Sequence, residues 1–165
     1  MHMTMDTEKR EIEMMILGIP QQQGSTKSMP YRKKDGRLGV STYSANDKLQ
    51  PWRDRVEYRI REVMTDQCVQ FNDTDPLYVN CTFTFLVPAS RHRKRKGYPL
   101  WHTTVPDVDK LIRAILDAVT VATGIDDSRV ARIETEKRYT DDNSEVGAYL
   151  RIRQFPQCYL GGRTC

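Results

Sequence analysis

Apolar and polar residues alternate with two different periods along this chain, and the periods predict its elements. An apolar run over 12–19, interrupted by Gly18 and followed by Pro20, is short enough for a buried strand. The stretch from there to Asp47 is rich in Gln, Gly, Ser and Pro, which predicts a long loop. A loop of that length usually carries a function.

Two segments have the spacing of amphipathic helices. Over 51–64, apolar residues such as Trp52 and Ile60 recur every three or four positions, with arginines between them. The second segment, 108–122, begins after Pro106 and ends before Gly124. Each helix therefore offers one apolar face to a core.

Three more segments are predicted strands. The segment 78–87 alternates and is rich in β-branched and aromatic residues, while 130–139 and 146–153 flank a turn-like stretch. The order β-α-β-α-β-β predicts an α+β fold, with two main helices packed on a mixed or antiparallel sheet. We expect a single domain over 1–165, with a core at about 12–153 and a poorly patterned tail at 154–165.

Composition narrows the class of protein. Hydrophobic residues make up 38% and charged residues 29% of the 165 positions, which is typical of a globular protein rather than a disordered one. No apolar run approaches the roughly 20 residues of a membrane helix, and the first residues lack the pattern of a secretory signal. A cytoplasmic location is the expectation.

Cysteine and histidine are too scattered to predict a zinc site, a disulfide framework or a histidine base. The four cysteines contain no C-x-x-C pair, so reduced thiols are expected. The residues concerned are Cys68, Cys81, Cys158, Cys165, His2, His92 and His102.

Positive charge is concentrated in two clusters, although the net charge is only +4. The run 91–96 is almost entirely cationic, and Arg32, Lys33 and Lys34 form a second cluster with Lys27. Such runs are often solvated surface loops. The alternative is contact with a phosphate backbone. The acidic second helix favours this alternative, because acids that act on DNA would repel it unless neighbouring cations attract the backbone.

The second helix carries acids on one face. Asp109, Arg113 and Asp117 stand four residues apart, and Asp126 and Asp127 follow the helix closely. Ordinary surface ion pairs, each worth under about 1 kcal/mol, would explain the helix alone. If the next strand returns alongside the helix, carboxylates from two elements meet, and carboxylate oxygens are suited to Mg²⁺. That arrangement favours a metal-dependent phosphodiesterase, and hence a nuclease.

At these residues the chain resembles the RusA-like Holliday junction resolvases, particularly their bacteriophage members. The resemblance covers roughly 12–153. It rests on a P-D-x-D-x-L-x-K/R-A-x-x-D-A-x core at 106–119, D-D-S-x-V at 126–130, the late Lys137, the segment 18–27 and L-Q-P-W-R at 49–53.

The resemblance implies roles for individual residues. Asp107, Asp109 and Asp127 correspond to catalytic carboxylates that bind Mg²⁺, or alternatively Mn²⁺, and Arg113 stands where the family usually has an essential Lys. A guanidinium can still clamp phosphate, although its geometry differs from that of an ammonium. Residues with possible supporting roles behind the metal ligands are Asp126 and Asp117. Residues expected to contact DNA are Lys27, Arg91, Arg93, Lys94, Arg95, Lys96 and Lys110.

The implied function is a Mg²⁺-dependent endodeoxyribonuclease that resolves Holliday junctions and related branched DNA by paired symmetric nicks. A four-way junction has two-fold symmetry, so a homodimer is implied as well. Forks and flaps stay open as further substrates. Two alternatives also stay open: a non-catalytic module that binds branched DNA, and a metal-dependent phosphoesterase for a small substrate, which the basic loop disfavours.

Overall fold

The computed structural model describes residues 10–24, 26–44, 46–89 and 97–156. Their elements, in chain order, are β1 (Glu11–Leu17), β2 (Thr26–Arg32), β3 (Leu38–Ser44), α1 (Leu49–Asp66), β4 (Leu77–Leu86), α3 (Val108–Thr123), β5 (Val130–Thr140) and β6 (Gly147–Gln154). Short 3₁₀ turns at Asp127–Arg129 and Asn143–Glu145 precede β5 and β6.

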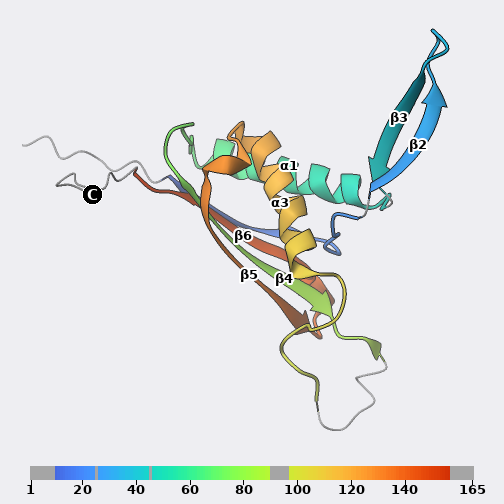
Figure 1. Cartoon of the computed structure of the whole chain (residues 1–165). Coiled ribbons are helices and arrows are strands. Elements are labelled where there is room, and N and C mark those ends of the chain that lie inside the picture. The colour runs from blue at the N-terminus through green and yellow to red at the C-terminus, as the bar shows by residue number, and fades with distance from the viewer. Residues whose placement is uncertain (1–9, 25, 45, 90–96, 157–165) are drawn as a thin grey trace, which may run out of the picture.

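Four strands form one mixed sheet in the order β1-β6-β4-β5. β4 runs parallel to β5, and the other neighbours are antiparallel. The parallel pair needs a crossover connection, which α3 supplies between β4 and β5. Figure 1 shows α1 and α3 together on one face of the sheet. The predicted α+β fold with two helices on a mixed sheet is confirmed.

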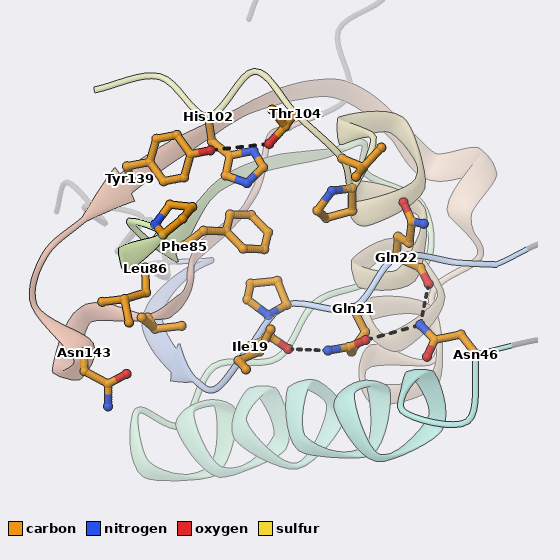
Figure 2. Close-up of a pocket in the computed structure, with 15 residues that line it drawn as sticks. Ile19, Gln21, Gln22, Asn46, Phe85, Leu86, His102, Thr104, Tyr139 and Asn143 are labelled. Atoms are coloured by element: carbon orange, nitrogen blue, oxygen red, sulfur yellow. Dashed lines mark hydrogen bonds between the residues drawn. The ribbon is translucent and has the colours of Figure 1, made fainter. Parts of the chain in front are cut away.

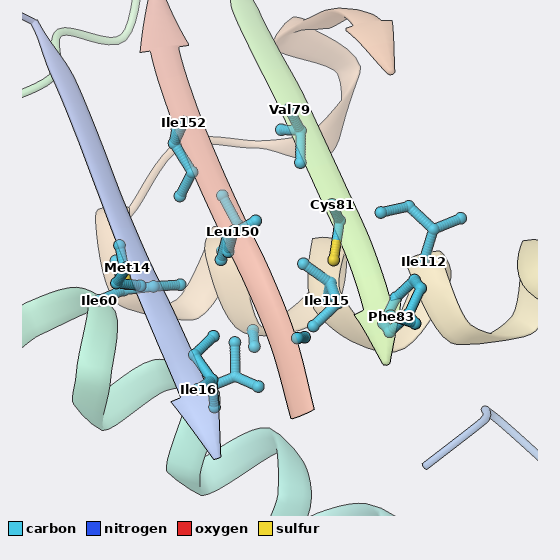
Figure 3. Packing of buried hydrophobic residues seen from close by; sticks show 14 of the residues in the cluster. Met14, Ile16, Ile60, Val79, Cys81, Phe83, Ile112, Ile115, Leu150 and Ile152 are labelled. Carbon is cyan, nitrogen blue, oxygen red and sulfur yellow. The ribbon is translucent and has the colours of Figure 1, made fainter. Parts of the chain in front are cut away.

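The core lies between this face and the two helices. Alternate residues of β1, β4 and β6 are buried toward the helices, as the two-residue period of a strand requires. Figure 3 shows the contacts among Met14, Ile16, Ile60, Val79, Cys81, Phe83, Ile112, Ile115, Leu150 and Ile152. Each fully buried aliphatic side chain of this kind contributes roughly 1.5–3 kcal/mol to the free energy of folding.

The other face of the sheet is polar and carries paired charges. Arg151 contacts Glu11 at 2.8 Å, and the hydroxyl of Tyr149 donates to Glu13 at 2.7 Å. Opposite charges on neighbouring strands neutralise each other here, so this face has little net charge to attract a polyanion.

The predicted long loop from Pro20 to Asp47 is wrong over most of its length, because it contains the antiparallel β2–β3 hairpin. The turn passes through Asp35 and Gly36, where Gly36 takes a φ of +81°. Asp-Gly is a strong hairpin signal, since glycine accepts a positive φ at no steric cost. The polar composition and Pro30 argued against strands in the sequence, because proline is rare inside sheets. In a two-stranded ribbon both strands are edges, where proline is tolerated.

The remaining elements agree with the predicted ones to within a few residues. Gln154, assigned to the tail, belongs to β6, and its side-chain amide donates to the carbonyl of Asn72 at 2.7 Å. In the described residues, Cys68 and Cys81 are free thiols, and burial raises the pKa of Cys81 well above its usual value. Among those residues, no helix has the length and apolar character needed to cross a bilayer.

Candidate active site

Asp107 is the N-cap residue of α3, and it is held by a hydrogen bond from its backbone and an ion pair from its side chain. The Asp107 N–H donates to Oε1 of Gln22 at 3.1 Å, and Nζ of Lys110 lies 2.8 Å from the Asp107 carboxylate. The hydrogen bond and charge of Lys110, aided by the charge of Lys137, lower the pKa of Asp107 below its usual value. Asp107 is therefore an anion throughout the neutral range.

Two other elements fix the position of this helix start. From β5, Nζ of Lys137 donates to the backbone carbonyls of Thr104 at 2.7 Å and Pro106 at 2.6 Å. From the segment after β1, the Gln23 N–H donates to the Lys110 carbonyl at 3.0 Å. The backbone on both sides of Asp107 is thus tied to segments distant in sequence.

The segment containing Gln22 is itself held in place by the residues before α1. Figure 2 shows Nδ2 of Asn46 donating to Gln21, at 3.3 Å, and the same atom donates to the carbonyl of Gln22 at 3.2 Å. The glutamine-rich sequence after β1 is therefore packed against the start of α3, through the contacts of Gln22 and Gln23.

A hollow of about 420 Å³ lies along the polar side of α3. Its lining residues are Asp109, Lys110, Ile112, Arg113, Leu116, Asp117 and Asp127. Asp109 comes from the first turn of the helix, whereas Asp127 begins the 3₁₀ turn that follows it. Two of the three predicted carboxylates, and the predicted cation Arg113, thus line one hollow.

The other acids of this region have structural contacts. Oδ2 of Asp117 lies 3.5 Å from Nη2 of Arg53, which links α3 to α1. Asp126 caps the 3₁₀ turn by accepting from the Ser128 N–H at 2.9 Å, and hydrogen bonds from Ser128 lower the pKa of Asp126.

Asp107, Asp109 and Asp127 do not gather into a three-carboxylate cluster within the chain. Over the part of the chain that the structure describes, no group of three or more His, Cys, Asp or Glu side chains is placed to hold a metal ion. Asp107 is the N-cap residue of α3 and does not line the hollow, in which only Asp109 and Asp127 of the three lie. The assignment of all three as metal ligands stays a prediction.

The predicted DNA-contacting residues are placed only in part. Lys110 lines the hollow, and the backbone of Lys27 pairs with Tyr43 in the hairpin. The side chain of Lys27 and the run 91–96, which includes Arg91, Arg93, Lys94, Arg95 and Lys96, lie outside what the structure describes.

Next to the helix start is a second, more apolar cavity of about 610 Å³ (Figure 2). His102 is buried there between the rings of Phe85 and Tyr139, with ring centroids 4.5 Å apart on each side. This histidine belongs to an aromatic stack.

Sequence reasoning missed the contacts that Lys137 and Gln22 make with the start of α3. Lys137 was noticed without a role. The role of Lys137 becomes visible only with the strand pairing, which sets it opposite the buried Phe83, where an apolar residue is usual. Gln22 offered no signal of this kind, since its contact depends on the path of a loop.

A comparison with known protein families identifies the family to which the described fold and hollow belong. A family model described as endodeoxyribonuclease RusA matches residues 20–152, which include both helices, the hollow and the hairpin. Curated proteins compared with the chain give no match. Since the matched region is most of the sequence, the chain belongs to the RusA family of endodeoxyribonucleases, enzymes that resolve Holliday junctions.

Proposed function

We propose that this protein is a Mg²⁺-dependent endonuclease that resolves four-way DNA junctions by paired symmetric nicks. The observation that carries the proposal is the hollow along α3, which combines Asp109, Asp127 and Arg113 in a chain of the RusA family. Acids that bind a metal ion, beside a cation that binds phosphate, are what a phosphodiester hydrolase requires.

The donor chemistry of the hollow fits Mg²⁺. Asp109 and Asp127 are exposed carboxylates in the hollow, and Mg²⁺ prefers such oxygens while retaining several of its own waters. A hollow of about 420 Å³ leaves room for those waters and for a phosphate group. When bound, the ion would lower the pKa of a water and offset negative charge on the phosphate.

The side chains of the hollow then have separate tasks. Asp109 and Asp127 would hold the ion from the hollow, with Asp107 at the start of α3 proposed as a third ligand, and Arg113 would donate hydrogen bonds to the non-bridging oxygens of the scissile phosphate. These bonds strengthen as negative charge grows on those oxygens in the transition state. Water oxygen bonds to phosphorus while the bond to the 3′-oxygen breaks, which leaves 5′-phosphate and 3′-hydroxyl ends.

Lys110 has a place in the same scheme. Its ammonium neutralises Asp107 in the absence of DNA, and both side chains are about half exposed, so the pair can separate at little cost. A nearby phosphate would provide a replacement partner for Lys110. Asp107 would then be released to bind the ion.

Paired nicks require two active sites related by two-fold symmetry. We therefore propose a homodimer, in which each protomer cuts one of two opposing strands. We place this activity in the cytoplasm. Branched DNA is the partner, and the bacteriophage affiliation stays a prediction.

A cleavage assay tests the proposal. Four-way junction, fork, flap and duplex DNAs, each end-labelled, are incubated with Mg²⁺, Mn²⁺ or EDTA. We expect symmetric nicks in the junction with metal, ends that ligase can rejoin, and intact DNA in EDTA. Tight junction binding without cutting under either metal would instead indicate a non-catalytic DNA-binding module.

A further inference from the structure

The β2–β3 hairpin stands apart from the rest of the fold. Its strands form a separate two-stranded sheet, and Figure 1 shows it projecting from the start of α1, away from the four-stranded sheet. Each strand has seven residues, so the ribbon extends about 20 Å at roughly 3.3 Å per residue. A hairpin outside a larger sheet is marginally stable in water, and a binding partner would compensate for that.

The end of the hairpin is cationic and has a defined backbone. Arg32, Lys33, Lys34 and Arg37 are exposed there, against the single carboxylate of Asp35. The Lys33 N–H donates to the Arg37 carbonyl at 2.8 Å, and the Arg37 N–H donates to Asp35 at 3.1 Å. The cations therefore lie on a turn whose backbone conformation is fixed by hydrogen bonds.

The two faces of the ribbon carry exposed apolar side chains behind this turn. Val40 pairs with Pro30 and Leu38 with Arg32, and Leu38 and Val40 are 76% and 68% exposed. The Tyr31 ring lies on the opposite face across Gly39, where a Cβ would come within 2.9 Å of the ring. Such exposure of large apolar groups beside cations is a mark of a binding surface.

We propose that the β2–β3 hairpin is an arm that enters a groove of a DNA duplex next to the branch point. The turn cations contact phosphates on both sides of the groove, and the apolar side chains on the two faces of the ribbon lie against the groove surfaces that flank it. The major groove is wide enough for a two-stranded ribbon. This inference rests on the proposed function, since it takes branched DNA as the substrate.

Charge favours DNA over a second copy of the chain as the occupant. Protein interfaces are depleted in lysine, whereas the end of this arm has four cations and one acid among residues 32–37. The outer face of the four-stranded sheet has balanced charges and would attract such an end weakly.

The test compares junction binding by the full-length protein and two variants. The arm variant carries Arg32→Ser, Lys33→Ser and Lys34→Ser. The control carries Arg132→Ser, Arg151→Ser and Arg153→Ser, which remove the same charge from the outer face of the sheet. Affinity for a labelled four-way junction is measured by anisotropy in EDTA at several salt concentrations, and the arm's reach by hydroxyl-radical footprinting.

For the arm variant, we expect affinity to fall at least tenfold and the slope of log affinity against log salt to decrease by about 0.9 per lost phosphate contact. Its footprint should shorten on the duplex arms, while the control variant keeps the wild-type slope and footprint. A further variant, Tyr31→Ser with Leu38→Ser, should lose affinity without a change in slope, because it removes no charge.

Unchanged affinity, slope and footprint in the arm variant would overturn the proposal, and so would absent junction binding by the wild-type protein. Conversion of a wild-type dimer to a monomer by these substitutions, seen by light scattering, would also overturn it and identify a protein interface. Because binding is measured in EDTA, failure of the arm is distinct from failure of the cleavage assay.

Discussion

The carboxylate of Asp109 lies in the first turn of α3, in the same hollow as Arg113 and Asp127. Asp109→Asn keeps the shape of the side chain but removes a charge that a divalent ion needs. We expect cutting of a junction to fall by roughly 100-fold or more, with junction binding in EDTA retained. The matched control is Asp142→Asn, at an exposed acid in the turn before β6. A near wild-type cutting rate in Asp109→Asn would exclude it as a metal ligand.

Arg113 tests whether the hollow uses charge or the geometry of the guanidinium. Arg113→Ala should slow cutting at saturating DNA by about 100-fold, the usual cost of removing a donor to transition-state oxygens. Arg113→Lys restores a point charge and should recover to within about tenfold of the wild-type rate. Single-turnover rates with Mg²⁺ make the comparison. A Lys variant as slow as the Ala variant would mean that the two-pronged geometry is essential.

Lys137 acts on the backbone before Asp107 through two carbonyl groups, of Thr104 and Pro106. Lys137→Met leaves both carbonyls without this donor, and the lost hydrogen bonds should cost about 1 to 2 kcal/mol locally. We expect faster hydrogen exchange at the Asp107 amide and slower cutting, with unchanged junction affinity. Lys137→Arg should restore part of both. Loss of affinity equal to the loss of rate would contradict a positioning role and indicate direct DNA contact.

At the scale of elements, the pairing of β1 with β6 leaves no room for a side chain at Gly147. A Cβ there would lie 2.1 Å from the carbonyl oxygen of Ile16. Gly147→Ala must therefore separate the two strands, and we expect the free energy of unfolding in urea to fall by about 1–3 kcal/mol. Gly36→Ala, in the open turn of the hairpin, is the comparison: alanine there is strained by the φ of +81° but its Cβ meets no atom within 4 Å, so the larger loss expected in Gly147→Ala measures the clash. Equal stability of Gly147→Ala and wild type would refute this close approach.

Hydrophobic pattern and composition were sufficient to predict the two helices and the four strands of the main sheet; the pattern is clearest in α1, α3, β4 and β6, each of which buries one face. It failed for the hairpin, whose exposed strands have no buried face to impose an alternation. The Asp35-Gly36 turn was the one local signal for it.

Only part of the candidate site could be predicted from the sequence. Helical spacing correctly placed Asp109 and Arg113 together, because it is a local property. The position of Asp127 relative to Asp107 depends on how the chain leaves α3, and the contacts of Lys137 depend on strand pairing. Neither is encoded in local spacing.

At the scale of the whole molecule, four carboxylates share one electrostatic property. Their pKa values are lowered by hydrogen bonds or neighbouring cations: Lys110 for Asp107, Ser128 for Asp126, Tyr78 and then Arg132 for Glu134, and Ser144 for Asp142. A lowered pKa in the folded state means that the unfolded chain binds protons first as the pH falls. The stabilisation is therefore complete above the unfolded values, about 3.9 for Asp and 4.3 for Glu.

We accordingly expect the free energy of unfolding to be independent of these groups between pH 6 and 8, and to fall as acid is added below about pH 4. Urea unfolding at a series of pH values measures this slope. The double variant Glu134→Gln with Asp142→Asn keeps hydrogen-bond acceptors but cannot titrate, so its slope between pH 5 and 3 should be shallower than that of wild type. An identical slope in the two proteins would mean that other groups govern acid unfolding.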